Sequence, residues 1–221
     1  MVDAHDSATV DHSLTRWLAV QALHDRDARL VDGGSDADDR IELARLFIDL
    51  PVSVVSEGRR ALPQKETAIA PLLPALAPAD EGPRVLLVGG PGSGKSTPTA
   101  MLAQMLRLSW LDRHAEHLPQ PPHDAGQQAR NELASLRDRQ RWPTIDGVIP
   151  LRVNLPSLAR WMASHRDGDA PLLWQHLATR AADELAAYDL SWEVTPARLR
   201  QVVEAAGPIV WILDGLDEGP R

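Results

Sequence analysis

The chain has 221 residues, 31 acidic and 23 basic side chains, and a formal net charge of −8. This length suits one domain with an appended segment, and the acidic balance, without a sustained basic stripe, argues against nucleic acid as a main partner. The sequence contains no cysteine, which excludes a disulfide framework and thiol chemistry.

The first third of the chain predicts helices separated by a turn. Leucines and a tryptophan recur among charged residues over 12–30, which indicates an amphipathic helix. The glycine-containing stretch 32–36 predicts a turn, and a second helix is expected over 38–48, ending before Pro51. These patterns predict a helical N-terminal segment over residues 1–56.

Residues 57–83 are rich in proline, alanine and glycine and are expected to form a linker. The most apolar stretch, 68–79, is too short to cross a bilayer and contains three prolines, so no membrane association is expected. The N-terminus is acidic and lacks the hydrophobic core of a targeting signal, which favours a cytoplasmic location.

An apolar run at 85–88 predicts a strand that leads directly into a glycine-rich loop. The loop matches G-x-x-x-x-G-K-[ST], a pattern whose backbone N–H groups hold phosphate oxygens. Lys95 is expected to reach the β- and γ-phosphates, and the Ser96 hydroxyl to bind Mg²⁺. The predicted nucleotide-binding residues are Gly89, Gly90, Pro91, Gly92, Ser93, Gly94, Lys95, Ser96 and Thr97.

Two further observations support a phosphate-binding loop at this position. Apolar residues at helical spacing follow the loop, which places the motif between a strand and a helix. Lys95 is one of only two lysines in the chain, the other being Lys65, although arginine is abundant. A flexible point charge is thus retained where a phosphate-binding loop needs one.

Beyond the loop, predicted strands and helices alternate, which favours a parallel α/β sheet. Pro98 falls in the first turn of the helix after the loop, where a missing N–H is tolerated. In chain order we expect a helix from about residue 94, a loop at 118–126, a helix at 131–141 and a strand at 148–153. Two more helices should follow. Asp169 caps the first, with Pro171 in its first turn, and Thr195 caps the second, which ends at Gly207.

The last strand carries the second candidate site. Residues 209–213 form a continuous apolar run, typical of a buried parallel strand, and Asp214 follows at its carboxyl end. Together with the upstream loop, Asp214 is predicted to hold Mg²⁺. Glu218, or the neighbouring Asp217, is predicted to activate a water molecule aimed at the γ-phosphate.

The loop GGPGSGKST and the later segment WILDGLDE resemble the NACHT family of STAND-class P-loop NTPases. The small Gly215 followed by the acidic pair at 217 and 218 is the distinguishing feature, and 148–156 resembles the second strand of that family. The resemblance covers 84–218 and extends weakly to 44–51. It implies an intracellular signalling switch that binds ATP or GTP with Mg²⁺, hydrolyses it slowly and self-associates in the full-length protein.

The family resemblance implies a three-layer α/β/α P-loop fold over 84–221, with sheet order 5-1-4-3-2. The strand between the loop strand and the Asp214 strand would follow residue 221, so we expect an incomplete parallel sheet of about three strands and a truncated chain. ATP is preferred over GTP because the sequence has no Asn-Lys-x-Asp guanine-recognition motif.

Two other functions stay open. A small-molecule kinase would need an arginine-bearing lid, for which Arg137, Arg139 and Arg141 are candidates, and a truncated chain could serve as a non-catalytic interaction fragment. A zinc site at His114, His117 and His123 is disfavoured, because these residues lie in a proline-rich stretch without cysteine.

Overall fold

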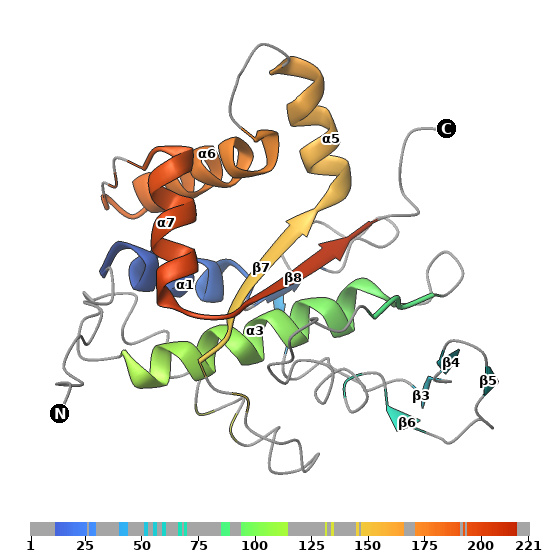
Figure 1. Ribbon diagram of the computed structural model, residues 1–221. Helices are drawn as coiled ribbons and strands as arrows, with labels where there is room; N and C mark the ends of the chain where they lie inside the picture. Colours follow the sequence, from blue (N-terminus) through green and yellow to red (C-terminus); the bar gives the residue numbers. More distant parts are fainter. Residues whose placement is uncertain are drawn as a thin grey trace, which may run out of the picture.

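The computed structural model shows a mixed α/β architecture (Figure 1). It describes residues 12–25, 27–29, 40–43, 51–52, 55–56, 59–60, 66–67, 69, 85–88, 94–114, 131, 134, 145, 147–165, 171–190, 192 and 194–215. The longer elements are α1 (His12–His24), α3 (Ser96–Arg113), β7 (Ile149–Asn154), α5 (Leu155–Ser164), α6 (Leu172–Ala186), α7 (Pro196–Ala206) and β8 (Ile209–Asp214).

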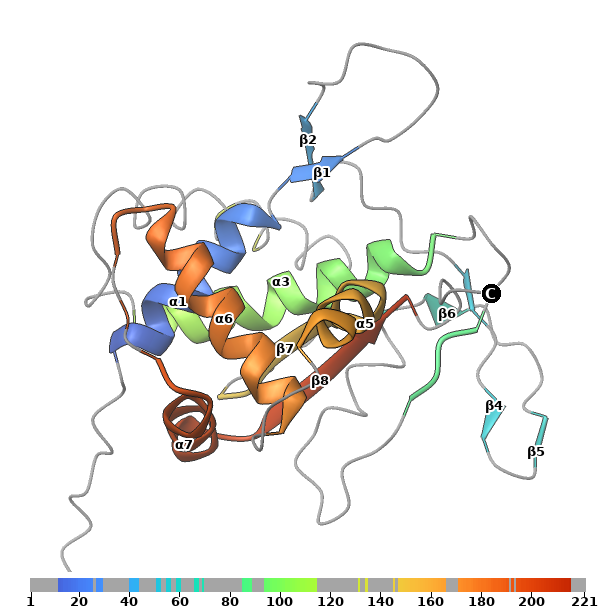
Figure 2. The ribbon, with the colours of Figure 1, turned by 90° about the horizontal axis from the view of Figure 1, so that it is seen from above.

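Strands β7 and β8 form a parallel two-stranded sheet, as the sequence predicted for both segments. Their register pairs Ile149 with Ile209 at one end and Asn154 with Asp214 at the other. Helix α3 packs along both strands, and α1 packs between α3 and α6 (Figures 1 and 2). The carboxyl ends of both strands therefore lie at the same edge, where parallel sheets place their ligands.

Local sequence signals explain where the helices begin. The Thr195 hydroxyl accepts a hydrogen bond of 3.2 Å from the Arg198 N–H, which caps α7 as predicted. Helix α5 was not predicted, although Asn154 caps it through the Ser157 N–H at 2.9 Å and Pro156 lies in its first turn. Pro171 is the N-cap of α6 rather than a first-turn residue, and Asp169 lies outside the described residues.

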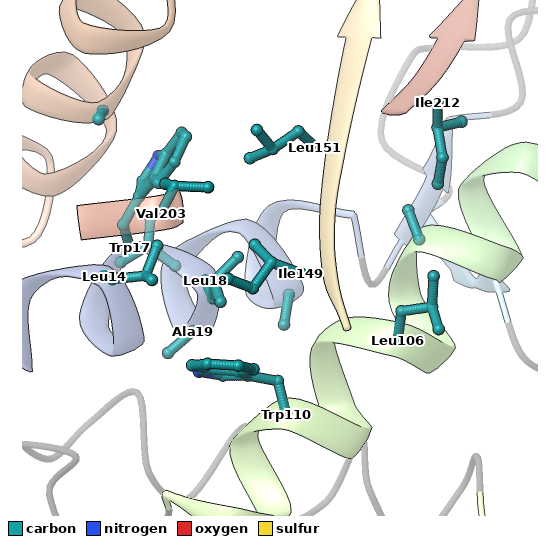
Figure 3. Packing of buried hydrophobic residues seen from close by; sticks show 14 of the residues in the cluster. Leu14, Trp17, Leu18, Ala19, Leu106, Trp110, Ile149, Leu151, Val203 and Ile212 are labelled. Atoms are coloured by element: carbon teal, nitrogen blue, oxygen red, sulfur yellow. The ribbon is translucent and has the colours of Figure 1, made fainter. Parts of the chain in front are cut away.

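One hydrophobic core joins α1 to α3, the sheet and the C-terminal helices (Figure 3). Most of α1 is buried, so it is a core helix rather than a surface amphipathic helix. The predicted apolar faces of α6 and α7 are buried or partly buried. Fully or almost fully buried side chains in this core include Leu14, Trp17, Leu18, Met101, Leu106, Ile149, Leu151, Leu177, Leu199 and Val203.

The N-terminal prediction was partly wrong. Helix α1 ends at His24, and residues 27–29, predicted as helix, form strand β1. Strand β1 (Asp27–Arg29) pairs antiparallel with β2 (Arg40–Glu42), which lies inside the predicted helix 38–48. Cross-strand pairing overrides local helix propensity here. Four two-residue strands follow: β3 (Pro51–Val52), β4 (Val55–Ser56), β5 (Arg59–Arg60) and β6 (Glu66–Thr67).

The strand predicted before the glycine-rich loop is absent from described residues 85–88, so two core strands are seen instead of three. Val85, Leu86 and Val88 are 54%, 73% and 79% exposed. No other described segment pairs with these residues, and a strand requires a ladder partner for its backbone groups. The prediction that β8 is buried on both faces was also wrong, because Trp211 and Leu213 are exposed.

Other predictions fall partly or wholly outside the described residues. The turn at 32–36 and the loop at 118–126 cannot be compared, and of the helix at 131–141 only residues 131 and 134 are described, both as helical. Within the described part of the chain, no helix combines the length and hydropathy needed to cross a bilayer.

We expect Gly207→Ala to destabilise the fold by about 2 to 4 kcal/mol, because it combines backbone strain with a steric clash. Gly207 has φ +155°, and a Cβ there would lie 2.9 Å from the backbone oxygen of Gly147. This contact brings together the segments that enter β8 and β7, so the backbone has little freedom to move away. Urea denaturation monitored by circular dichroism measures the loss.

Gly147→Ala is the matched control. Its φ of +72° is also unfavourable for alanine, but the nearest atom to an added Cβ is an Arg113 side-chain nitrogen at 3.6 Å. This variant should lose only the strain, about 1 to 2 kcal/mol. Equal losses in the two variants would contradict the steric explanation.

Candidate functional site

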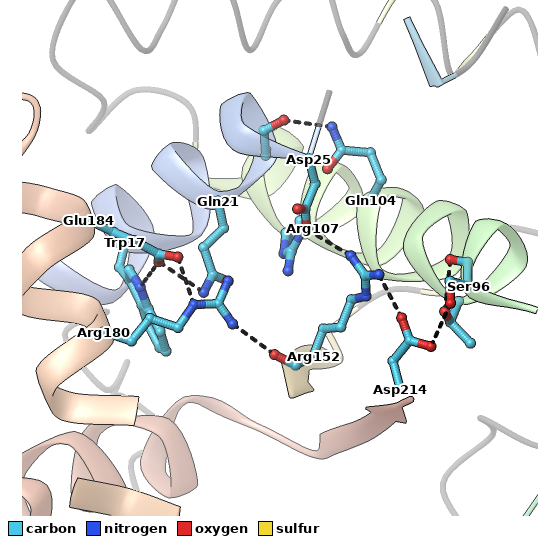
Figure 4. A network of polar contacts seen from close by, with 12 residues as sticks. Trp17, Gln21, Asp25, Ser96, Gln104, Arg107, Arg152, Arg180, Glu184 and Asp214 are labelled. Atoms are coloured by element: carbon cyan, nitrogen blue, oxygen red, sulfur yellow. Dashed lines mark hydrogen bonds and ion pairs between the residues drawn. The ribbon is translucent and has the colours of Figure 1, made fainter. Parts of the chain in front are cut away.

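One residue from each of the two predicted motifs lies at the carboxyl end of the sheet. The Ser96 hydroxyl, at the first residue of α3, donates a hydrogen bond of 2.9 Å to Asp214 Oδ1 at the end of β8 (Figure 4). These residues are 118 positions apart in the chain. Asp214 is only 6% exposed, so its carboxylate is held by protein groups rather than by bulk water.

The described backbone before Ser96 includes one left-handed glycine, as a glycine-rich loop allows. Gly94 has φ +76°, a left-handed conformation that favours glycine. Its carbonyl accepts a hydrogen bond of 3.2 Å from the Thr97 N–H, and Lys95 is the N-cap residue of α3. The N-terminal end of α3, where the helix dipole is positive, therefore lies beside the buried Asp214 carboxylate.

Arg152, on strand β7, is the second partner of Asp214. Its Nη2 donates to Asp214 Oδ2 at 2.7 Å, so each carboxylate oxygen of Asp214 has one protein donor. The other terminal nitrogen of Arg152, Nη1, lies 3.7 Å from Asp25 Oδ2. The Arg152 guanidinium therefore lies between two carboxylates, one at the sheet edge and one just after α1.

Asp25 is joined more tightly to Arg107 on α3, with an Nη1–Oδ2 distance of 2.5 Å. Burial pushes the pKa of Asp25 upward, but the positive charges of Arg107, Arg152 and Arg180 outweigh it and hold that pKa below its ordinary value. The Arg107 side chain is fully buried, and this burial lowers the pKa of its guanidinium although Asp25 opposes the shift. The charge of Arg107 therefore depends on Asp25 for compensation.

A second set of contacts runs from β7 to α1 through α6 (Figure 4). Arg180 Nη1 donates to the backbone oxygen of Arg152 at 3.0 Å, and Arg180 Nε pairs with Glu184 at 2.6 Å. Glu184 also accepts hydrogen bonds from Trp17 Nε1 at 2.7 Å and Gln21 Nε2 at 3.2 Å. Helix α1 is thus connected to the same strand that carries Arg152.

Among the predicted site residues, the structure brings Ser96 together with Asp214 and places 94–97 at the start of α3. Residues 89–93, Asp217 and Glu218 lie outside the described residues, as do the lid candidates Arg137, Arg139 and Arg141. Their roles stay predictions.

Sequence reasoning missed Arg152, Asp25 and Arg107. Arg152 had a usable signal, since a charged residue inside the apolar stretch 148–153 needs a buried partner. Asp25 and Arg107 had none, because their pairing joins the residue after α1 to α3 across 82 positions of the chain.

Of the three histidines considered for zinc, His114 is the one that lies in the described part of the chain. His114 stacks on Trp110 with ring centroids 4.4 Å apart, and its Nδ1 lies 2.8 Å from the Trp110 backbone oxygen. His117 and His123 lie outside the described residues. In the described part of the chain, three or more His, Cys, Asp or Glu residues are nowhere grouped to hold a metal ion.

No protein-family model matches the sequence, and no curated protein or solved structure matches it.

Proposed function

We infer that Ser96 and Asp214 belong to a site that binds a nucleoside triphosphate together with Mg²⁺. The observation that carries this proposal is the 2.9 Å hydrogen bond between the two side chains. The serine ends a glycine-lysine-serine motif, and the carboxylate ends a parallel strand. An aspartate at a strand end is common by itself, whereas its contact with the serine of a phosphate-loop motif at one sheet edge is the arrangement that phosphate-loop proteins use.

The donor atoms suit magnesium. Mg²⁺ prefers oxygen ligands, and it is commonly held by one or two carboxylates together with water and substrate phosphates. Ser96 and Asp214 would hold the ion, which would neutralise phosphate charge. Lys95 and the N–H groups at the start of α3 would orient the phosphates.

The wider proposal is an ATP-dependent switch of the NACHT type in a P-loop fold, which is supported by the sequence resemblance and by this meeting of motifs. Glu218 is the first candidate for activating water, with Asp217 as the alternative. GTP in place of ATP, a cytoplasmic location and self-association through the nucleotide-binding domain belong to the same proposal.

A non-catalytic interaction module is the second candidate. The observation that favours it is the exposure of Val85, Leu86 and Val88, which leaves an apolar run outside the sheet. Such a module would not need Mg²⁺·ATP, so a binding measurement separates the two functions.

We expect isothermal titration calorimetry to show that the chain binds ATP more tightly with Mg²⁺ than with EDTA. Asp214→Asn preserves the shape of the side chain but removes its charge. It should abolish most of the gain in affinity that Mg²⁺ provides, a change of about tenfold or more. The EDTA value should not fall, because a negative charge beside the phosphates has been removed.

Asp183→Asn is the matched control, because it makes the same chemical change at an exposed position on α6. It should bind as the wild type does. If the wild type takes up neither ATP nor GTP with Mg²⁺, the proposed site is wrong. If ATP binds and Asp214→Asn keeps the full effect of Mg²⁺, the assignment of Asp214 is wrong.

A further inference from the structure

Asp214 has a positively charged partner that the phosphate-loop motif does not supply. Arg152 Nη2 lies 2.7 Å from Asp214 Oδ2, and the Asp214 side chain is 7% exposed. An arginine at this distance neutralises the carboxylate and repels any cation that the carboxylate attracts. The effect is strong here because burial weakens screening by solvent.

Arg152 also has a second carboxylate within reach. Asp25 Oδ2 lies 3.7 Å from Arg152 Nη1, so the guanidinium can strengthen one ion pair as it weakens the other. Asp25 retains acceptor capacity beside Arg107, because an ionised carboxylate has about four lone-pair sites. Arg152 can therefore leave Asp214 without becoming an unpaired buried charge.

We propose that Arg152 is a positioning residue that shields Asp214 when no metal is bound and turns to Asp25 when Asp214 holds a divalent cation. This inference rests on the proposed function, since it assigns a cation to Asp214. It makes the affinity for Mg²⁺ depend on a contact with the residue that follows α1.

A change in the position of Arg152 would alter the contacts at the end of α1, which also packs against α3. Gln104 Nε2 donates to the Ala22 backbone oxygen at 2.7 Å, and Arg107 pairs with Asp25, so two side chains of α3 hold this end. Helix α3 itself begins at Ser96. If Arg152 moves toward Asp25, a second guanidinium therefore joins the ion pair that already links the end of α1 to α3.

The test measures the Mg²⁺ concentration that gives half of the metal-dependent gain in binding of a fluorescent ATP analogue. Arg152→Gln should lower this midpoint by about threefold to tenfold, because Asp214 loses a competing positive charge. Affinity for the analogue in EDTA should not rise, because the Asp214 carboxylate then loses the positive charge that neutralises it. Arg200→Gln is the matched control, since Arg200 forms an exposed pair with Glu204 on α7.

A second comparison tests the role of Asp25. Asp25→Asn alone would leave buried Arg107 uncompensated, so it is made in an Arg107→Met background and compared with Arg107→Met alone. Removing the alternative partner of Arg152 should raise the Mg²⁺ midpoint by about threefold, opposite in direction to Arg152→Gln. Circular dichroism checks that each variant folds. If Arg152→Gln does not fold, Arg152→Met is used in its place.

Opposite shifts in the two comparisons support the proposal. A midpoint that is unchanged or raised in the neutral Arg152 variant, with analogue binding intact, overturns it and leaves the proposed function standing. An unchanged midpoint on loss of Asp25 overturns the transfer to Asp25. If the wild type does not bind the analogue with Mg²⁺, no midpoint exists, and the proposed function fails together with this inference.

Discussion

Lys95→Ala is expected to weaken the binding of Mg²⁺·ATP by at least about a hundredfold. In the proposed site the Lys95 ammonium group donates to two phosphate groups, and hydrogen bonds that involve charged groups contribute about 1.5 to 3 kcal/mol each. Lys95 is the N-cap residue of α3, so its backbone stands beside Ser96, which contacts Asp214. Calorimetry with ATP and saturating Mg²⁺ measures the change.

Lys65→Ala is the matched control, because Lys65 is the only other lysine in the sequence and its loss changes net charge equally. It should bind Mg²⁺·ATP within about twofold of the wild type. Wild-type affinity in Lys95→Ala, with the control also unchanged, would show that the loop does not hold the phosphates.

Asp25→Asn is expected to lower the free energy of unfolding by about 2 to 4 kcal/mol. The substitution preserves the side-chain shape and removes the charge that compensates the fully buried Arg107 guanidinium, 2.5 Å away. Asp25 itself is 21% exposed, which keeps the loss below that of a wholly buried pair. Urea denaturation at pH 7 measures the loss.

A double-mutant cycle with Arg107→Met isolates the interaction between Asp25 and Arg107. The double variant should recover most of the stability lost in Asp25→Asn, because no unpaired buried charge remains. If Asp25→Asn costs the same in both backgrounds, the ion pair does not stabilise the fold.

The pH dependence gives an independent check on Asp25. Its pKa in the folded protein lies below the ordinary value of 3.8, so its ionised form stabilises the fold above that value. This contribution should be lost as pH falls from about 4 through the folded pKa. The stability difference between the wild type and Asp25→Asn should therefore shrink in that window.

Sequence patterns predicted much of the local structure around the candidate site. The apolar runs at 148–153 and 209–213 are strands, and Thr195 caps α7, because period, burial and capping depend on neighbouring residues. The Gly94 conformation and the position of Ser96 at a helix start follow from the loop motif in the same way.

Local patterns failed where a segment depends on a distant partner. Residues 85–88 have the composition of a strand, but no described strand supplies the hydrogen-bond ladder that would make them one. Strands β1 and β2 replaced predicted helix because they pair with each other. Trp211 and Leu213 are exposed because one face of β8 is only partly covered, with Trp174 of α6 packed edge-on against Trp211, which an apolar run cannot reveal.

The sequence alone determined the residues of the proposed phosphate and metal site: a glycine-rich loop with Lys95 and Ser96, and an aspartate at a strand end. Only the tertiary structure placed Ser96 beside Asp214 and set Arg152 between Asp214 and Asp25. The physical reason is that motifs and caps act over a few residues. Ion pairs between β7, β8 and the end of α1 depend on how those elements pack in three dimensions.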